Sequence, residues 1–127
     1  MVLEREFNWY DFLDLADRIT KISFDNIDEA RARTAMSRAY YACYHKALYV
    51  LKKKYNFEPS GEHSHKEVLE KLRFYNPELG DEFERLLDGR VDADYHIDKR
   101  INIKKAEMVV LQSKQVFTAI RKMYKSP

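Results

Sequence analysis

The stretch "NIDEARARTAMSRAYYACYHKALYVLKKKY", residues 26–55, decides the fold. Apolar residues recur along it in steps of three and four, the spacing of one helix face. This row comprises Met36, Tyr40, Cys43, Ala47 and Leu51. The stretch therefore predicts one long helix, with Asn26 as its N-terminal cap and Glu29 as the reciprocal partner of that cap.

Both flanks of this stretch predict further helices. Upstream, Asn8 with Asp11 is typical of a helix start, and four apolar residues follow at helical spacing: Phe12, Leu15, Ala16 and Ile19. Downstream, "EPSGE", residues 58–62, interrupts the chain. Ser64 with Glu67 then forms a capping-box pattern, which predicts a short helix with Val68, Leu69 and Leu72 on its apolar side.

The last part of the chain predicts two more helices. Asn76 is the expected cap of the first, with Pro77 at the first helical position, where its missing N–H group costs nothing. That helix carries Phe83, Leu86 and Leu87 before Gly89 weakens it. Asn102 is the expected cap of the second, which runs to about Tyr124 with an apolar side made of Met108, Leu111, Val116, Phe117 and Ile120.

The whole chain reads as one all-α domain. No stretch alternates with a period of two, and only three glycines and three prolines supply material for turns. We therefore expect an up-and-down bundle of four to five helices that occupies residues 1–127, without repeats or linkers. Short loops make consecutive helices antiparallel.

Composition restricts the classes of protein. Of the 127 residues, 45% are hydrophobic and 35% charged, which excludes a disordered or membrane-spanning chain. The start, "MVLEREFNWYDFLDL", lacks the uninterrupted apolar region of a signal peptide, and a single cysteine cannot form an internal disulfide. We expect a cytoplasmic protein with no contact to a membrane. A net charge of +2 permits contact with nucleic acid without requiring it.

Two histidines and the cysteine are weak candidates for chemistry. In "HSH", His63 and His65 are two residues apart and do not share a helix face, and no second cluster stands at ligand spacing. We therefore expect no metal and no cofactor. Cys43 lies on the apolar row of the long helix, where burial suppresses the thiolate, so we interpret it as a core residue.

The segment "SRAYYACYHKAL", residues 37–48, mixes tyrosines with small alanines. The alanines favour close helix packing, and the tyrosine hydroxyl groups then need partners such as Arg38 or a carboxylate. A polar subset that includes Arg38 and Tyr41 is the alternative, because it could face a cleft and support ligand binding by stacking.

"GRVDADYH", residues 89–96, concentrates charged and polar side chains. On a continuous helix Arg90 would pair with Asp94, and Asp92 with His96, for about 0.3–0.5 kcal/mol each on an exposed face. Arg90 and His96 are separated by about 120° of rotation and about 9 Å of rise on such a helix. Either the backbone departs from a helix near Gly89, or another chain completes a site.

An arginine and a histidine without a metal or a protein nucleophile suit cleavage of RNA. The ribose 2′-OH supplies the nucleophile, and His96 could move its proton or protonate the leaving oxygen. Arg90 could stabilise the negative charge of the transition state.

Four segments carry a resemblance to a known family: "AMSRAYYACYHKALYVL", "HKEVLEKL", "GRVDADYH" and "SKQVFTAI". In this order they resemble the small stand-alone branch of the HEPN superfamily, over about residues 30–122. The resemblance implies a homodimeric helical bundle and a metal-independent endoribonuclease, often a toxin, whose R-x4–6-H motifs meet at the dimer interface. Arg90 and His96 are the matching arginine and histidine, and Asp94 with Tyr95 would orient or line the cleft. Val91 stands where active members often carry asparagine.

Three hypotheses follow. The first is an RNA-cleaving homodimer with Arg90 and His96 as catalytic residues, inhibited by a nucleotidyltransferase-fold antitoxin. Its supporting residues are Asp92, Asp94, Tyr95, Arg38 and Tyr41. The second is a non-catalytic module that binds a nucleotide or serves as the helical partner of a nucleotidyltransferase. The third is a protein whose aromatic helices only dimerise.

Overall fold

The computed structural model describes residues 6–22 and 26–127, so parts of the predicted 1–127 domain, residues 1–5 and 23–25, lie outside the described residues. The described part is all helical, which confirms the predicted fold class. Its elements are α1 (Tyr10–Lys21), α2 (Asp28–Tyr55), α3 (Ser64–Tyr75), α4 (Pro77–Tyr95) and α5 (Ile103–Lys125). None of these helices is long and apolar enough to cross a membrane.

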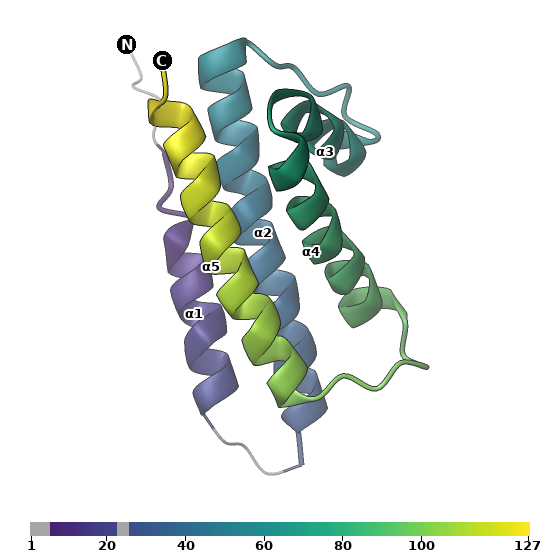
Figure 1. The fold of residues 1–127 in the computed structure, drawn as a ribbon. Coiled ribbons are helices and arrows are strands. Elements are labelled where there is room, and N and C mark those ends of the chain that lie inside the picture. Colours follow the sequence, from purple (N-terminus) through teal and green to yellow (C-terminus); the bar gives the residue numbers. More distant parts are fainter. Residues whose placement is uncertain (1–5, 23–25) are drawn as a thin grey trace, which may run out of the picture.

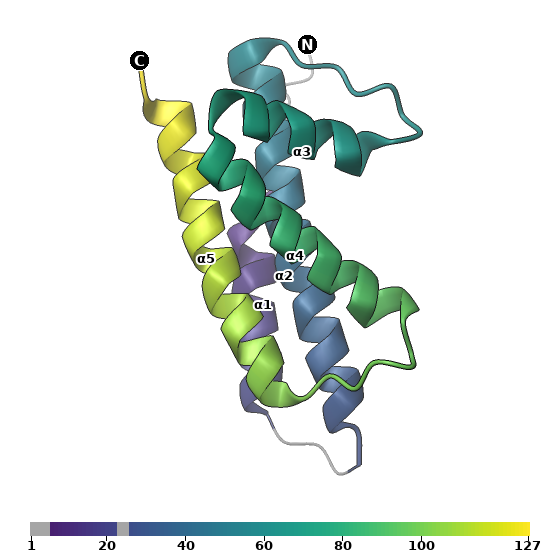
Figure 2. The same cartoon turned by 45° about the vertical axis from the view of Figure 1, so that its right-hand side comes forward.

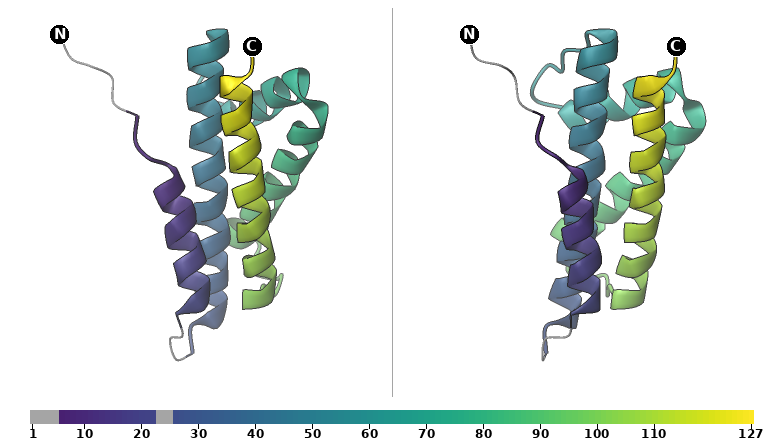
Figure 3. Two further views of the ribbon diagram at one scale, coloured as in Figure 1. Left: turned by 60° about the vertical axis from the view of Figure 1, so that its left-hand side comes forward. Right: turned by 90° about the vertical axis from the view of Figure 1, so that its left-hand side faces the viewer.

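Helix α2 is the centre of the bundle and packs against each of the other four helices. α1 runs antiparallel to α2 and lies beside it, while α5 runs parallel to α2 (Figure 1). α3 and α4 form a second unit, in which α3 crosses near the C-terminal end of α2 and α4 descends obliquely (Figure 2). Views from the α1 side place α3 and α4 behind α2 and α5 (Figure 3).

Small residues on α2 allow this close packing. Ala39, Ala42 and Ala47 are fully buried, as close helix packing of residues 37–48 predicts, and Ala35 before them is fully buried too. The largest fully buried side chains come from all five described helices and include Tyr40, Phe83, Leu13, Met36, Leu51, Leu72 and Ile120. Full burial of one such side chain stabilises the fold by about 1.5–3 kcal/mol, so these contacts dominate the stability of the bundle.

Cys43 is a core residue, as predicted. Its side chain is fully buried, and the thiol donates a hydrogen bond to the carbonyl oxygen of Ser113 at 3.2 Å. Burial raises the pKa of the Cys43 thiol, which keeps it protonated and unreactive.

Three predicted core positions are wrong. Met108 and Leu111 on α5 are 57% and 59% exposed, and Leu15 on α1 is 47% exposed. The buried face of α5 contains Val109 and Val110, and the buried face of α1 contains Leu13. A helix that carries apolar residues on several of its sides has more than one apolar row in its sequence, and contacts with α2 decide which row is buried.

The predicted caps of α4 and α5 are confirmed. The side chain of Asn76 accepts a hydrogen bond from the Leu79 N–H at 3.1 Å, and Pro77 occupies the first turn of α4. The side chain of Asn102 accepts a hydrogen bond from the Lys105 N–H at 2.8 Å. Each cap satisfies one of the N–H groups that a helix start leaves without a partner.

The predicted caps of α2 and α3 are wrong. Asn26 has a φ of 62°, outside the extended conformation of an N-cap, and α2 begins after Ile27 without a side-chain cap. Ser64 is the first residue within α3, so it lies one position too far along to cap it. The Glu67 carboxylate instead accepts a hydrogen bond from the Ser60 N–H at 3.0 Å.

Gly89 does not interrupt α4, so of the two alternatives that the sequence left open, the departure of the backbone from a helix near Gly89 is wrong. The helix continues to Tyr95. A glycine costs about 1 kcal/mol in a helix, and burial of Leu86 before it and Ala93 after it outweighs that cost. Arg90, Asp92 and Asp94 therefore all project from one regular helix.

Candidate functional site

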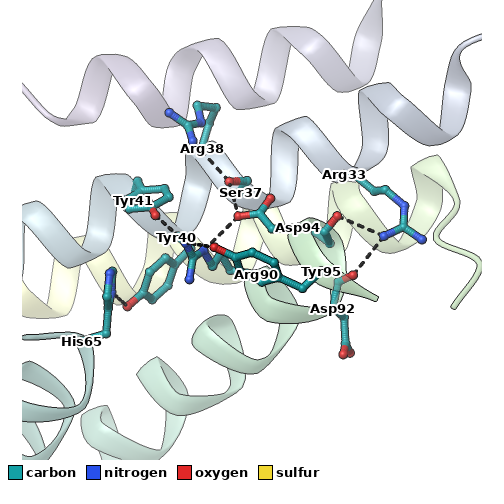
Figure 4. A network of polar contacts seen from close by, with 11 residues as sticks. Arg33, Ser37, Arg38, Tyr40, Tyr41, His65, Arg90, Asp92, Asp94 and Tyr95 are labelled. Atoms are coloured by element: carbon teal, nitrogen blue, oxygen red, sulfur yellow. Dashed lines mark hydrogen bonds and ion pairs between the residues drawn. The ribbon is translucent and has the colours of Figure 1, made fainter. Parts of the chain in front are cut away.

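Arg33 of α2 fixes the C-terminal end of α4. Its guanidinium donates hydrogen bonds to the carbonyl oxygens of Asp92 at 2.9 Å, Ala93 at 3.0 Å and His96 at 3.1 Å, and also to that of Lys99. The last carbonyl groups of a helix have no partner within the helix and carry partial negative charge. One largely buried cation thus holds the segment in which the candidate residues lie (Figure 4).

Arg90 lies in a pocket of tyrosines and a carboxylate. Its side chain is only 12% exposed, and its Nε lies 2.9 Å from Oδ2 of Asp94. One terminal nitrogen donates to the hydroxyl groups of Tyr41 at 2.5 Å and Tyr95 at 3.4 Å. The guanidinium also lies over the rings of both tyrosines (Figure 4). Burial opposes the charge, but the tyrosines and Asp94 outweigh it and raise the pKa of Arg90.

The Asp94 carboxylate extends this network to α2. The Ser37 hydroxyl donates to Asp94 at 3.1 Å, and Arg38 donates to the Ser37 hydroxyl at 3.3 Å. The Arg38 guanidinium lies 4.9 Å from the centre of the Tyr41 ring. Arg38 and Tyr41, which the sequence placed with the site as supporting residues, thus share one network with Arg90, Asp94 and Tyr95.

His96 belongs to a second network at the end of α4. Its Nδ1 lies 2.8 Å from Oδ1 of Asp92, and the Lys99 ammonium contacts the same oxygen at 3.0 Å. These two contacts, that of His96 first, hold the pKa of the Asp92 carboxyl below its ordinary value. The side chain of His96 is 44% exposed, and its Nε2 forms no hydrogen bond or ion pair among the described residues.

No contact joins Arg90 to His96 within the described chain. Asp94 contacts Arg90 and Ser37 of α2, whereas Asp92 contacts His96 and Lys99 in the segment that leads to α5. The Asp92 side chain points away from the Arg90 network (Figure 4). The two ion pairs expected from the spacing are both present, and the two candidate catalytic side chains remain apart.

His65 contributes a third polar contact close to Arg90. Its Nδ1 lies 2.7 Å from the hydroxyl group of the fully buried Tyr40, and its ring packs against Tyr44 at 4.2 Å between centroids. Burial, and then the positive charge of Arg90, lower the pKa of His65. Burial also raises the pKa of Tyr40, so this pair is a neutral hydrogen bond at physiological pH.

Residues that the sequence did not single out complete the site. Arg33 and Ser37 were missed because their acceptors in α4 and in the segment after it lie at least 57 residues away along the chain, where no local spacing signals them. His65 was weighed only as a metal ligand, yet its partner is Tyr40. Within residues 6–22 and 26–127, no group of three or more histidine, cysteine, aspartate or glutamate side chains could hold a metal ion.

The site therefore combines a fixed cation, a carboxylate–imidazole pair and an accessible aromatic ring. Tyr95 is 65% exposed although its hydroxyl group lies beside Arg90. Such a set can bind a phosphate, move a proton and stack on a base. Comparison of the chain with models of protein families, with curated proteins and with solved structures finds no match in any of the three.

Proposed function

We propose that this protein is a metal-independent endoribonuclease that cleaves RNA by attack of the ribose 2′-OH. The observation that carries the proposal is the Asp92–His96 pair at the exposed end of α4, with His96 six residues after Arg90. The carboxylate orients the imidazole through Nδ1 and leaves Nε2 toward solvent. This is the arrangement that a general acid or base requires.

The reaction needs one proton acceptor and one proton donor. His96 in its neutral form takes the proton from the 2′-OH, the 2′ oxygen forms a bond to phosphorus, and the bond to the 5′ oxygen breaks. The leaving oxygen receives a proton from an imidazolium, and the products are a 2′,3′-cyclic phosphate and a 5′-OH. The imidazolium that His96 becomes when it accepts the 2′-OH proton is that donor, so each site needs one His96 and one Arg90.

Arg90 has the binding role in this proposal. Asp94 and Tyr41 hold its guanidinium in one orientation, so little further ordering is needed when a phosphate arrives. Donors held in place before the reaction stabilise the negative charge of the transition state most effectively. The exposed ring of Tyr95 beside Arg90 offers a surface on which a base can stack.

The separation of Arg90 from His96 supports a homodimeric site. Within one chain the two side chains belong to different networks, and a two-fold axis near the end of α4 would bring Arg90 of one subunit toward His96 of the partner subunit. Ile97, next to His96, is 89% exposed, which fits a surface covered by a second copy. The resemblance to HEPN toxins suggests the same dimer, a cytoplasmic location and a nucleotidyltransferase-fold antitoxin as partner.

The test is incubation of the purified protein with RNA in EDTA, followed by identification of the product ends. We expect 2′,3′-cyclic phosphate ends from the wild type and a loss of at least about 100-fold in rate for His96→Ala, the usual contribution of one acid–base group. His63→Ala is the matched control, because His63 is exposed and lies outside the site. Arg90→Lys keeps a charge beside Asp94 but loses the fork of donors, so activity should fall while the fold persists.

Intact RNA with the wild type, or equal cleavage by wild type and His96→Ala, would refute the proposal. The second candidate is a non-catalytic module that binds a nucleotide or a nucleotidyltransferase partner. The ion pair between Arg90 and Asp94 favours it, because Asp94 already neutralises the arginine charge that would stabilise the transition state of cleavage. Retained binding of nucleotides or RNA without cleavage would identify that module.

A further inference from the structure

A cavity of about 530 Å³ lies between α4, α5 and the segment that connects them. Its wall includes Gly89 and Asp92 of α4, Arg100 and Asn102 of the connecting segment, and Val109 of α5. The volume lies within the range of about 300–1,000 Å³ that is typical of ligand sites. Of the residues in the polar contacts described above, Asp92 and Lys99 line this cavity.

Positive charge predominates in the wall of this cavity. Arg85, Lys99, Arg100 and Lys105 line it, against two carboxylates, Asp88 and Asp92. Of the four cations only Lys99 forms an ion pair among the described residues, with Asp92. Three cationic side chains therefore surround one cavity without a carboxylate partner in the described part of the chain.

The start of α5 adds to this charge. Asn102 caps α5 at the wall of the cavity, and the first turn that follows contains lysines but no acidic residue. A helix start carries partial positive charge and is stabilised by acidic side chains, so lysines there are unfavourable for the helix alone. An anion bound in the cavity would offset the unfavourable interaction between these lysines and the helix start.

The cavity adjoins the proposed catalytic pair. Asp92 lines the cavity and also contacts His96, and Lys99 contacts the same carboxylate oxygen of Asp92. A polyanion that passes His96 would therefore reach Lys99 and then the three unpaired cations.

We infer that this cavity is a binding site for single-stranded RNA, in which Arg85, Arg100 and Lys105 contact the phosphate groups next to the scissile bond. This inference rests on the proposed ribonuclease function. The cavity is too small for a duplex, and it accommodates about one nucleotide of a flexible strand. Asp88 of α4 and Gln112 of α5 also line it and have polar groups that can meet a base edge.

The test measures binding rather than cleavage. A fluorescein-labelled single-stranded RNA of about ten nucleotides is titrated in EDTA over a range of salt concentrations, since phosphate contacts are read from the salt dependence. The protein is the full chain with His96→Ala, which prevents cleavage, alone or combined with Arg85→Gln and Lys105→Gln. Lys122→Gln in the same background is the control, because Lys122 is exposed on α5 and lies outside the cavity.

Loss of two phosphate contacts reduces the steepness of log affinity against log salt by about 1.4. When the affinities with and without these contacts are equal at 1 M salt, the variant binds about 25-fold more weakly at 0.1 M salt. We expect this change for the double cavity variant and less than a twofold change for the control. Circular dichroism checks that the variants are folded. We expect them to fold, because Arg85 and Lys105 are exposed.

Equal affinity of the double cavity variant and the Lys122→Gln control would overturn the inference, and so would a His96→Ala protein that binds no RNA. The proposed function fails separately. If the wild type does not cleave RNA yet the cavity variant loses binding, the RNA site stands and the ribonuclease falls. If the wild type cleaves RNA and the cavity variant binds as the control does, the ribonuclease stands and the RNA site falls.

Discussion

Replacement of Arg33 by alanine should release the end of α4 from α2. Arg33 is 16% exposed and donates to four carbonyl groups between Asp92 and Lys99. Alanine has the highest helix propensity, so the substitution does not weaken α2 itself. Any loss of stability therefore reports on the contacts between the guanidinium and the carbonyl groups.

The magnitude follows from the kind of contact removed. A hydrogen bond that involves a charged group contributes about 1.5–3 kcal/mol. Water can replace some of the hydrogen bonds that Arg33 donates, because the segment 96–100 is largely exposed. We expect Arg33→Ala to lower the free energy of unfolding by about 2–3 kcal/mol in urea titrations followed by circular dichroism. Hydrogen exchange should accelerate most at the amides of His96 and Lys99.

Glu29→Gln is the matched control. Glu29 accepts a hydrogen bond from Arg33 at 3.1 Å but is 48% exposed, so this pair contributes no more than about 0.5 kcal/mol. A loss in Arg33→Ala no larger than in Glu29→Gln would refute the reasoning. Faster exchange spread evenly over all helices would also refute it, because it would mean that Arg33 supports the fold in general.

Three further outcomes follow from the packing and the buried polar groups. Gly80→Ala should destabilise the protein by more than about 1 kcal/mol, because the added Cβ would lie 2.6 Å from the Arg73 backbone, as thermal unfolding can measure. Gly89→Ala in the same helix should instead stabilise it by about 0.5–1 kcal/mol, since the new Cβ meets only the flexible end of Met36 at 3.4 Å. The folded protein holds the pKa of His65 below the unfolded value of about 6.5, so stability should be fully present above that pH and fall as the pH decreases below it. His65→Gln should reduce this acid loss without abolishing it, because the pKa of His45 is lowered in the same direction; an unchanged pH profile would contradict the assignment.

The helices could be predicted from local patterns, since caps such as Asn76 and Asn102 and breaks such as residues 58–62 act within a few residues of the chain. Helix faces were harder to predict. Met108 and Leu111 continue an apolar row of α5 that the sequence alone favours, yet they are exposed because α2 contacts a neighbouring row.

The candidate site divides in the same way. The pairs of Arg90 with Asp94 and of Asp92 with His96 could be predicted because one helical turn separates their members. The role of Arg33 and the contact between Ser37 and Asp94 depend on how α2 crosses α4, which no spacing in the sequence encodes.

The claim that one site is shared between two subunits has a direct test. Arg90→Lys and His96→Ala proteins are unfolded together, refolded as a mixture and assayed for RNA cleavage in EDTA. In a two-fold symmetric dimer, half of the mixed population carries one intact site of two, so we expect recovery of about a quarter of the wild-type rate. A mixture as inactive as the two variants measured separately would contradict a site that combines Arg90 of one subunit with His96 of the partner subunit.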